Sequence, residues 1–394
     1  MPFAIQEGSA RTPRKGSFLR LFGAQDPWEA LMRLKVLLST LSMAALAVLV
    51  PCIAPAGEIP TNLHYKVLAP IRHGNLSVFP VVAATTHDTQ DFLTLDEGLR
   101  SGEVVVSESG SIAPLIRPRR GGAPTQRPAG GPQVNQLVLV NNSKRPLILL
   151  AGEIVTGGKQ DRVIGKDRLV PAESDPIDLG VFCVEPGRWT GPKMSFDGLP
   201  SSMAAPAVRA KAMADKDQAK VWAEVRNSQA GVAAKLASPE AAAVINGTTS
   251  YAKVMQNDDV KQKVDSMAIP IQHDYQSLIR QLRDRNAVGV VVAVNGEIIW
   301  ADVFANTGLL EKYWPKLIRS YAAEAIVSRA KSGEADIRSA QQFLDDLEGR
   351  RETVETEPGL YRHTEITGDG FKAFELTSLL PKTGFDLHLA KMAD

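Results

Sequence analysis

The stretch Val288–Phe304, VGVVVAVNGEIIWADVF, decides the fold class of this chain. Two runs rich in β-branched residues flank Asn295-Gly296, the dipeptide that a two-residue type I′ turn prefers. The stretch therefore predicts an antiparallel hairpin whose strands are Val288–Val294 and Glu297–Phe304.

Strand and helix patterns occur in separate blocks on either side of this hairpin. Strand patterns occupy much of 65–185, and a helical pattern rich in Ala, Lys, Gln and Asp occupies about 200–285. Two amphipathic helices follow the hairpin, and three short strands lie between Leu360 and Leu389. Blocks of strands without βαβ alternation favour an α+β fold, with an antiparallel-rich sheet built from non-adjacent segments.

Several helix boundaries have their own signals. Thr94–Glu97 is a capping box, which predicts a short helix that ends at Gly102. Apolar residues over Trp314–Ile326 follow the i, i+3, i+4, i+7 spacing of a helix, and Pro315 is expected in its first turn. A second stripe over Ile337–Leu347 predicts another amphipathic helix.

Composition limits the classes of function. The chain has 394 residues, of which 44% are hydrophobic and 23% are charged, as in ordinary soluble globular proteins. Its 45 Lys and Arg against 44 Asp and Glu leave a net charge of +1, so no nucleic-acid partner is expected. Two cysteines, Cys52 and Cys183, exclude a disulfide scaffold and a four-cysteine zinc site.

An uncharged segment near the N-terminus predicts export to the periplasm or the medium. Residues 36–56 carry no charge, follow the basic segment Met32–Lys35 and end in Ala54-Pro55-Ala56, as in a secretory signal peptide. Met32 would itself be a normal start for such a signal. The alternative is an uncleaved membrane anchor over 36–56, because about 20 apolar residues can span a bilayer.

The predicted organisation is a leader and signal peptide over 1–56 and a single α+β domain over 57–394. Within the domain, residues 117–133 read RPRRGGAPTQRPAGGPQ and hold four Gly, four Pro and four Arg. Such a stretch cannot bury apolar surface, so it predicts a flexible loop between two strands. The alternative is that its basic run holds an anionic partner.

The first candidate site is the loop Gly157-Gly158-Lys159-Gln160, together with Arg162. Two glycines let a backbone approach a ligand closely, and Lys159 and Arg162 supply positive charge for a small anion. No Ser or Thr follows Lys159 to hold magnesium, so the loop is not a phosphate-binding P-loop. The alternative is a tight hairpin that carries a surface lysine.

The second candidate cluster contains Cys183, Glu185, Arg188 and Trp189. Cys183 and Glu185 lie on the same face of an extended strand, and the other two follow across a Pro-Gly turn. A nucleophilic cysteine needs a base such as histidine, and no histidine of the sequence is paired with Cys183 by its spacing. The alternative is a core cysteine beside a structural Glu185–Arg188 ion pair under Trp189. The histidines show no metal-binding spacing, so neither a metal site nor a cofactor is predicted.

We expect the 157–162 loop and the 185–189 turn to lie together at one end of the sheet. The strand that leads into Gly157 and the strand that ends near Glu185 belong to the same β-rich half of the chain. Two polar turns at neighbouring strand ends would then form one charged cluster.

Several strings of this sequence resemble a bacterial domain family of unknown function, the ADP-ribosylglycohydrolase and rhodanese-phosphatase-superfamily-associated domain. The resemblance spans most of 64–330, and it is most specific at Gly157–Arg162 (GGKQDR) and Cys183–Trp189 (CVEPGRW). The other similar strings are GNLSVFP at 74–80, TLDEGL at 94–99, QAKVWAEV at 218–225 and the hairpin stretch 288–304. The resemblance implies a genomic link to ADP-ribose or phosphate chemistry and gives a hint about fold and site.

Two functions from different classes remain open. The first is an exported domain that binds a small anionic ligand or a partner without catalysis. The second is a hydrolase or transferase acting on a phosphate- or ribose-bearing substrate. In that case Lys159, Arg162 and Arg188 would hold the anion, Glu185 would be the general acid or base, and Cys183 is the other candidate catalytic residue.

Overall fold

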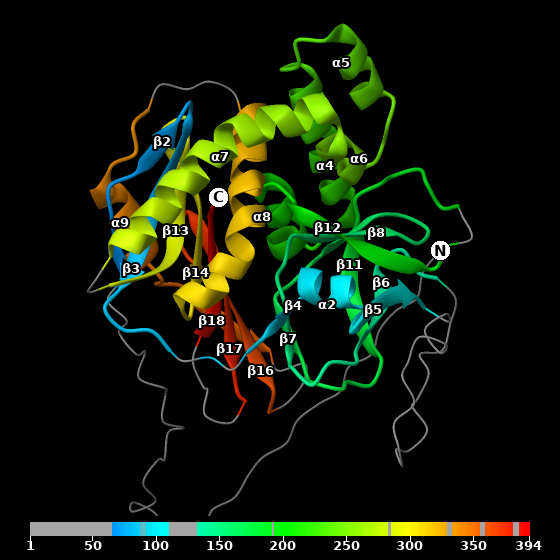
Figure 1. Ribbon diagram of the computed structural model, residues 1–394, viewed down its shortest axis with the longest axis horizontal. Helices are drawn as coiled ribbons and strands as arrows, with labels where there is room; N and C mark the ends of the chain where they lie inside the picture. The colour runs from blue at the N-terminus through cyan, green and yellow to red at the C-terminus, as the bar shows by residue number, and fades with distance from the viewer. Residues whose placement is uncertain are drawn as a thin grey trace, which may run out of the picture. The chain divides into compact units, whose positions relative to one another are not determined.

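The predicted hairpin lies in the middle of a nine-stranded sheet (Figure 1). Strands β13 (Asn286–Val294) and β14 (Glu297–Phe304) pair antiparallel in the computed structural model. Asn295 and Gly296 both have positive φ, 53° and 79°, as a type I′ turn requires. The structure describes residues 65–87, 89, 91–109, 132–190, 193–282, 285–328, 333–354, 359–380 and 386–394. These residues belong to one compact unit, Leu63–Asp394.

Early, middle and late segments of the chain build this sheet. Its strand order is β1-β3-β13-β14-β18-β17-β16-β15, with β2 also paired to β3, and every pairing in it is antiparallel. The predicted α+β class and the sheet of non-adjacent segments are confirmed. The remaining strands are β1 (Lys66–Val67), β2 (Ile71–His73), β3 (Leu76–Ala83), β15 (Arg350–Val354), β16 (Tyr361–Thr367), β17 (Phe371–Ser378) and β18 (Asp386–Ala393).

A closed six-stranded barrel stands apart from the large sheet, in the order β11-β6-β5-β12-β8-β9. Its interior is filled by Val, Leu, Ile and Phe side chains, which form a hydrophobic core of their own. A short sheet, β10-β7-β4, accompanies it. These strands are β4 (Leu93–Thr94), β5 (Val104–Glu108), β6 (Gln136–Asn141), β7 (Leu147–Leu149), β8 (Glu153–Gly157), β9 (Arg162–Ile164), β10 (Arg168–Val170), β11 (Ile177–Cys183) and β12 (Ser195–Met203).

The predicted leader and signal peptide, 1–56, lies outside the described residues. The predicted loop 117–133 also lies outside them, apart from Pro132 and Gln133. Both assignments therefore stay predictions. Of the helices that the structure describes, none combines the length and apolar character needed to cross a membrane.

The predicted helical block is observed, but it starts later than expected because β12 extends to Met203. This strand pairs with β5 and β8 and thereby closes the barrel, a long-range pairing that outweighs local propensity. The described helices are α2 (Leu95–Ser101), α3 (Pro206–Ala210), a π-helical turn (Lys211–Asp215), α4 (Gln218–Ala233), α5 (Pro239–Asn246), α6 (Tyr251–Gln256), α7 (Asp258–Gln281), α8 (Thr307–Val327) and α9 (Ile337–Asp345).

The predicted start of α8 is wrong. The helix begins at Thr307, two turns before Pro315, and the Asn306 side chain caps it by accepting a hydrogen bond of 2.9 Å from the Leu309 N–H. Pro315 therefore lies inside the helix. A proline there removes one backbone hydrogen bond, and we attribute its tolerance to the burial of α8 on most of its surface. The capping box at Thr94 and the helix over Ile337–Asp345 are confirmed.

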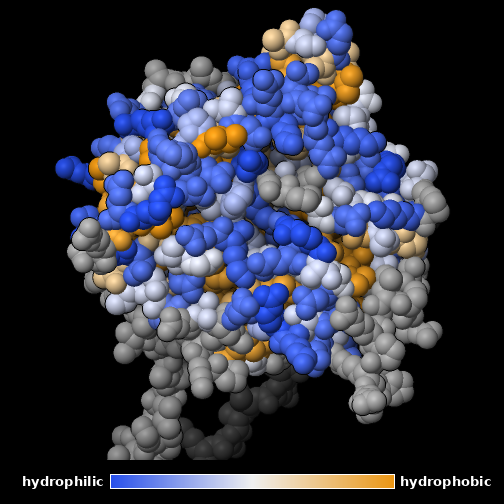
Figure 2. All heavy atoms as spheres, viewed as in Figure 1, coloured by the Kyte–Doolittle hydropathy of each residue, from blue (hydrophilic) through white to orange (hydrophobic). Residues whose placement is uncertain are grey.

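Helices cover the large sheet on two sides. Helices α7 and α8 pack with one face of the sheet in the main hydrophobic core, and α9 packs on the other face. Helix α8 also contacts β12, so it lies between the large sheet and the barrel (Figure 1). The face drawn in Figure 2 is mostly hydrophilic, with apolar atoms gathered over the protruding tip at α5, where Val244 is exposed.

Candidate functional site

The two candidate turns meet at one end of the barrel. The turn Gly157–Arg162 joins β8 to β9, and the turn Glu185–Trp189 follows β11. Strands β9 and β11 pair directly, with Arg162 opposite Cys183. The expected proximity of the two turns is therefore observed.

Close packing explains why both turn positions 157 and 158 are glycine. Gly157 has φ 122°, and a Cβ there would lie 2.8 Å from the Ser195 carbonyl oxygen. Gly158 has φ 50°, and a Cβ there would lie 2.2 Å from the Phe196 ring and 2.8 Å from a carboxylate oxygen of Glu108. Glycine is thus required by the approach of the turn to β12 and β5.

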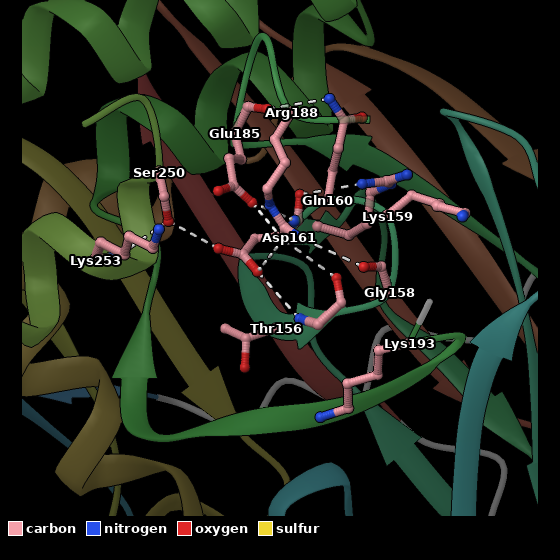
Figure 3. Close-up of polar contacts among 12 residues, drawn as sticks. Thr156, Gly158, Lys159, Gln160, Asp161, Glu185, Arg188, Lys193, Ser250 and Lys253 are labelled. Atoms are coloured by element: carbon pink, nitrogen blue, oxygen red, sulfur yellow. Dashed lines mark hydrogen bonds and ion pairs between the residues drawn. The ribbon is translucent and has the colours of Figure 1, made fainter. Parts of the chain in front are cut away.

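Asp161 is the centre of the hydrogen-bond network at this barrel end (Figure 3). Its carboxylate accepts hydrogen bonds from the Gly157 N–H at 3.1 Å and from the Ser250 hydroxyl at 2.8 Å. Its own N–H donates to Glu185 Oε2 at 3.2 Å. Burial and the neighbouring Glu185 raise the pKa of Asp161, against the opposing Ser250 hydrogen bond.

Arg188 links the two turns through ion pairs and hydrogen bonds. Its Nη2 lies 2.6 Å from Glu185 Oε2 and 3.4 Å from Asp161 Oδ1. The same guanidinium donates to the carbonyl oxygens of Gly157 and Gly158 at 3.4 Å. The carboxylate of Glu185 is therefore occupied by an ion pair, and a role as general acid or base would first require that pair to break.

Cys183 is buried behind this network. Its sulfur accepts a hydrogen bond of 3.3 Å from the Glu185 N–H, and burial raises the pKa of the thiol. At neutral pH the residue is thus the thiol, and the charged groups near it among the described residues are Arg162 and Glu185. This environment favours the core alternative over a nucleophilic thiolate.

Arg162 is buried, and most of its donors are unused. Nη1 donates to the Asp161 carbonyl at 3.4 Å, whereas Nε and Nη2 have no hydrogen-bond partner among the described residues. The nearest carboxylate oxygen to Nη2 is Oε1 of Glu108, at 3.9 Å, which is longer than a hydrogen bond. Glu108 itself is buried, and its Oε2 also lacks a partner.

Strand alternation directs the side chains of Arg162 and Glu108 into the barrel. They lie at the barrel end that carries the turns 157–162 and 185–189, which we call the barrel mouth. Glu108 shares a face of β5 with Val104 and Val106, which lie in the barrel core. Arg162 shares a face of β9 with Ile164 in the same way. Glu108 is not among the predicted site residues, although the alternation of VVVSE indicates that its carboxylate faces the same side as two core valines.

The remaining predicted residues surround this cluster. Trp189 is 42% exposed, and its ring centre lies 5.7 Å from Cζ of Arg162. The tryptophan therefore lies over Arg162, and its expected cover of the Glu185–Arg188 pair stays a prediction. The Lys159 N–H donates to Glu108 Oε1 at 2.8 Å, and its side chain extends away from Asp161 in Figure 3. Gln160 donates to the Glu185 carbonyl at 3.1 Å, while its buried Oε1 has no partner among the described residues.

The chain is thus an α+β protein with a cluster of polar side chains at one end of a small barrel. Several buried polar atoms of this cluster have no hydrogen-bond partner among the described residues. Residues 64–390 match the model of one family, the ARG and Rhodanese-Phosphatase-superfamily-associated Protein domain, and the chain belongs to this family. Comparisons with curated proteins and with solved structures found no match. Within the described residues, no group of three or more His, Cys, Asp or Glu side chains could hold a metal ion.

Proposed function

We propose that this protein binds a small oxyanion at the barrel mouth, with Arg162 as the central binding group. The observation that carries the proposal is the unpaired edge of its guanidinium. Nε and Nη2 lie on the same edge and form a fork that matches two oxygens of a carboxylate or a phosphate. A buried donor without a partner costs about 1–3 kcal/mol, so a ligand that pairs with both donors would recover that energy.

The other residues of the two turns have distinct parts in this proposal. Gly157 and Gly158 bring the backbone of the turn close to the fork, and Lys159 adds positive charge at the rim. Gln160 offers its unpaired Oε1 to a ligand hydroxyl. Arg188 holds the turns in place through Glu185, and Trp189 is a cover whose ring must move to admit the ligand.

A hydrolase or transferase is the less well supported function. Glu185 is held by Arg188, and the Cys183 thiol is buried, so neither is poised for proton transfer or attack. If ARG in the family description stands for ADP-ribosylglycohydrolase, the association fits a phosphate- or ribose-bearing ligand. A family description names a neighbourhood, so this agreement concerns the ligand class alone.

The test is a thermal-shift titration of the full chain with inorganic phosphate and with acetate. Binding to the native state raises the melting temperature of the wild type as ligand concentration rises. Arg162→Gln should abolish the shift that the ligand causes. The matched control Lys216→Gln, which alters an exposed lysine paired with Glu365 on the large sheet, should keep it. A wild type that shifts with neither ion, or an Arg162→Gln variant that shifts equally, would contradict the proposal.

We also propose export with cleavage after Ala56, on the pattern of residues 32–56. The test is N-terminal sequencing of the protein recovered from outside the cytoplasm. Gly57 as the first residue supports cleavage. An intact Met32 or Met1 on the exported protein would favour the membrane-anchored alternative.

A further inference from the structure

The most informative group that the proposed site leaves unused is Glu108, which faces the Arg162 fork from the opposite side of the barrel mouth. Its Oε1 accepts the Lys159 N–H at 2.8 Å and lies 3.9 Å from Arg162 Nη2. Its Oε2 is buried and has no hydrogen-bond partner among the described residues. An unpaired guanidinium edge and an unpaired carboxylate oxygen thus belong to two buried side chains that lie within 3.9 Å of each other.

This arrangement does not form a good ion pair by itself. A charge-assisted hydrogen bond between a guanidinium and a carboxylate is normally about 2.7–2.9 Å long. The observed 3.9 Å leaves Nε, Nη2 and Oε2 all unpaired. One ligand that accepts two hydrogen bonds from Arg162 and shares a third with Oε2 would pair all three atoms.

We propose, resting on the proposed oxyanion function, that Glu108 selects a phosphate group by sharing one proton with a phosphate oxygen. An anion bound to Arg162 would face a second negative charge at Oε2 unless a proton lay between them. A phosphate or a phosphate monoester carries a P–OH that can donate to the Glu108 carboxylate. Sulfate has no such proton near neutral pH, so it can bind only when Glu108 takes up a proton. A site built to hydrogen-bond a ligand hydroxyl rejects an analogue that lacks it.

The surroundings of Glu108 act on its protonation in opposite directions. The groups that face it are Lys159 and Arg162 on the segment from β8 to β9 and Arg188 after β11. On β12 its neighbour is the apolar ring of Phe196, and on β6 its partner residue is Leu137. Burial raises the pKa of the Glu108 carboxyl, while the Lys159 N–H and Arg162 oppose the rise. Burial therefore favours the protonated carboxyl, and the Lys159 N–H and Arg162 favour the carboxylate.

The experiment compares phosphate and sulfate by calorimetric titration of the full chain at pH 8.5, where both are dianions that differ by one proton. The wild type should bind phosphate at least about tenfold more tightly than sulfate. Glu108→Gln removes the titrating group and keeps its shape, so the two affinities should come within about threefold. A parallel titration with methyl phosphate shows whether the site takes free phosphate or the phosphate group of an ester.

A second measurement uses sulfate alone. The charge of sulfate is constant between pH 5.5 and 8.5, so a pH-dependent affinity must come from the protein. Sulfate should bind the wild type at least about tenfold more weakly at pH 8.5 than at pH 5.5. Proton uptake should make the measured binding enthalpy depend on the ionisation enthalpy of the buffer. In Glu108→Gln its affinity should not change with pH.

The outcomes separate this inference from the proposed function. Equal phosphate and sulfate affinities in the wild type, with a pH-independent sulfate affinity, would overturn the role of Glu108 and leave oxyanion binding intact. A wild type that binds neither ion at either pH would overturn the proposed function itself. Selectivity that persists in Glu108→Gln would place the discriminating group elsewhere and also overturn the inference.

Discussion

The Arg209 guanidinium and the Asp302 carboxylate form two parallel hydrogen bonds, each 3.0 Å long, and neither side chain has any exposed surface. Arg209 lies on α3, directly after the barrel strand β12, and Asp302 lies on β14 of the large sheet. The pair therefore links the barrel side of the molecule to the large sheet. His388 and Tyr321 also contact Asp302, at Oδ1 and Oδ2 respectively.

Asp302→Asn should strongly destabilise the protein. Arg209 and His388 hold the pKa of Asp302 far below its usual value, although burial alone would raise it, so the residue is a carboxylate. The amide leaves Arg209 buried without a counter-charge, which typically costs about 3–5 kcal/mol. Urea denaturation measures the free energy of unfolding. Asp197→Asn in the exposed pair with Lys193 is the control, and it should change that free energy by less than about 1 kcal/mol.

Stability should also fall as the pH becomes alkaline, because of His388. Its Nδ1 lies 2.5 Å from Asp167 Oδ2, and its Nε2 lies 3.1 Å from Asp302 Oδ1. Burial lowers the pKa of the imidazole, but the two carboxylates outweigh burial and raise it to about 9. A raised folded-state pKa contributes stability that is full below the unfolded pKa of about 6.5 and is lost as the pH rises through about 9.

The measurement is the free energy of unfolding at pH 6, 7.5 and 9. The wild type should lose stability across this interval. His388→Gln cannot titrate, so its free energy of unfolding should start lower at pH 6 and change less with pH. Parallel pH profiles for the two proteins would show that His388 is not the group responsible.

Local patterns in the sequence were sufficient for the elements that depend on neighbouring residues. Asn295-Gly296 and the capping box at Thr94 act over two to four residues, and both are observed. The prediction that Pro315 lies in the first turn of α8 was wrong because the Asn306 cap sets the helix start. Tertiary packing tolerates the proline inside the helix. Closure of the barrel depends on the pairing of β12 with β5 and β8, which no local pattern specifies.

For the candidate site, too, the sequence predicted the local features and not the long-range contacts. The proximity of the two turns followed from their place at strand ends. The partners of those turns come from distant segments: Ser250 lies 89 positions from Asp161, and Glu108 lies 51 positions from Lys159. Whether Arg162 is paired or unpaired depends on a difference of about one ångström in the position of a distant carboxylate, which spacing along a chain does not determine.

Arg188→Ala should lower stability by an intermediate amount. The arginine side chain is 31% exposed, but Glu185 and Asp161 beside it are 3% and 7% exposed. Its loss leaves two buried carboxylates without their counter-charge, so we expect a cost between the roughly 0–1 kcal/mol of a surface pair and the roughly 3–5 kcal/mol of a buried one. Lys159→Ala is the control, with a change below about 1 kcal/mol. A variant that folds as stably as wild type and loses only phosphate binding would make Arg188 a ligand group.

Gly158→Ala tests the packing on which the barrel mouth depends, and Gly187→Ala is its matched control. Both glycines have positive φ, 50° and 89°, so alanine at either position carries a backbone cost of about 1–2 kcal/mol. A Cβ at Gly187 meets no atom within 4 Å, whereas a Cβ at Gly158 would lie 2.2 Å from the Phe196 ring. Overpacking of this kind adds about 1–3 kcal/mol. Denaturant unfolding should therefore show Gly158→Ala to be the less stable variant. Equal losses of stability for both variants would mean that Phe196 and Glu108 can move aside, and glycine at 158 would then be explained by the approach of a ligand instead of by the approach of β12.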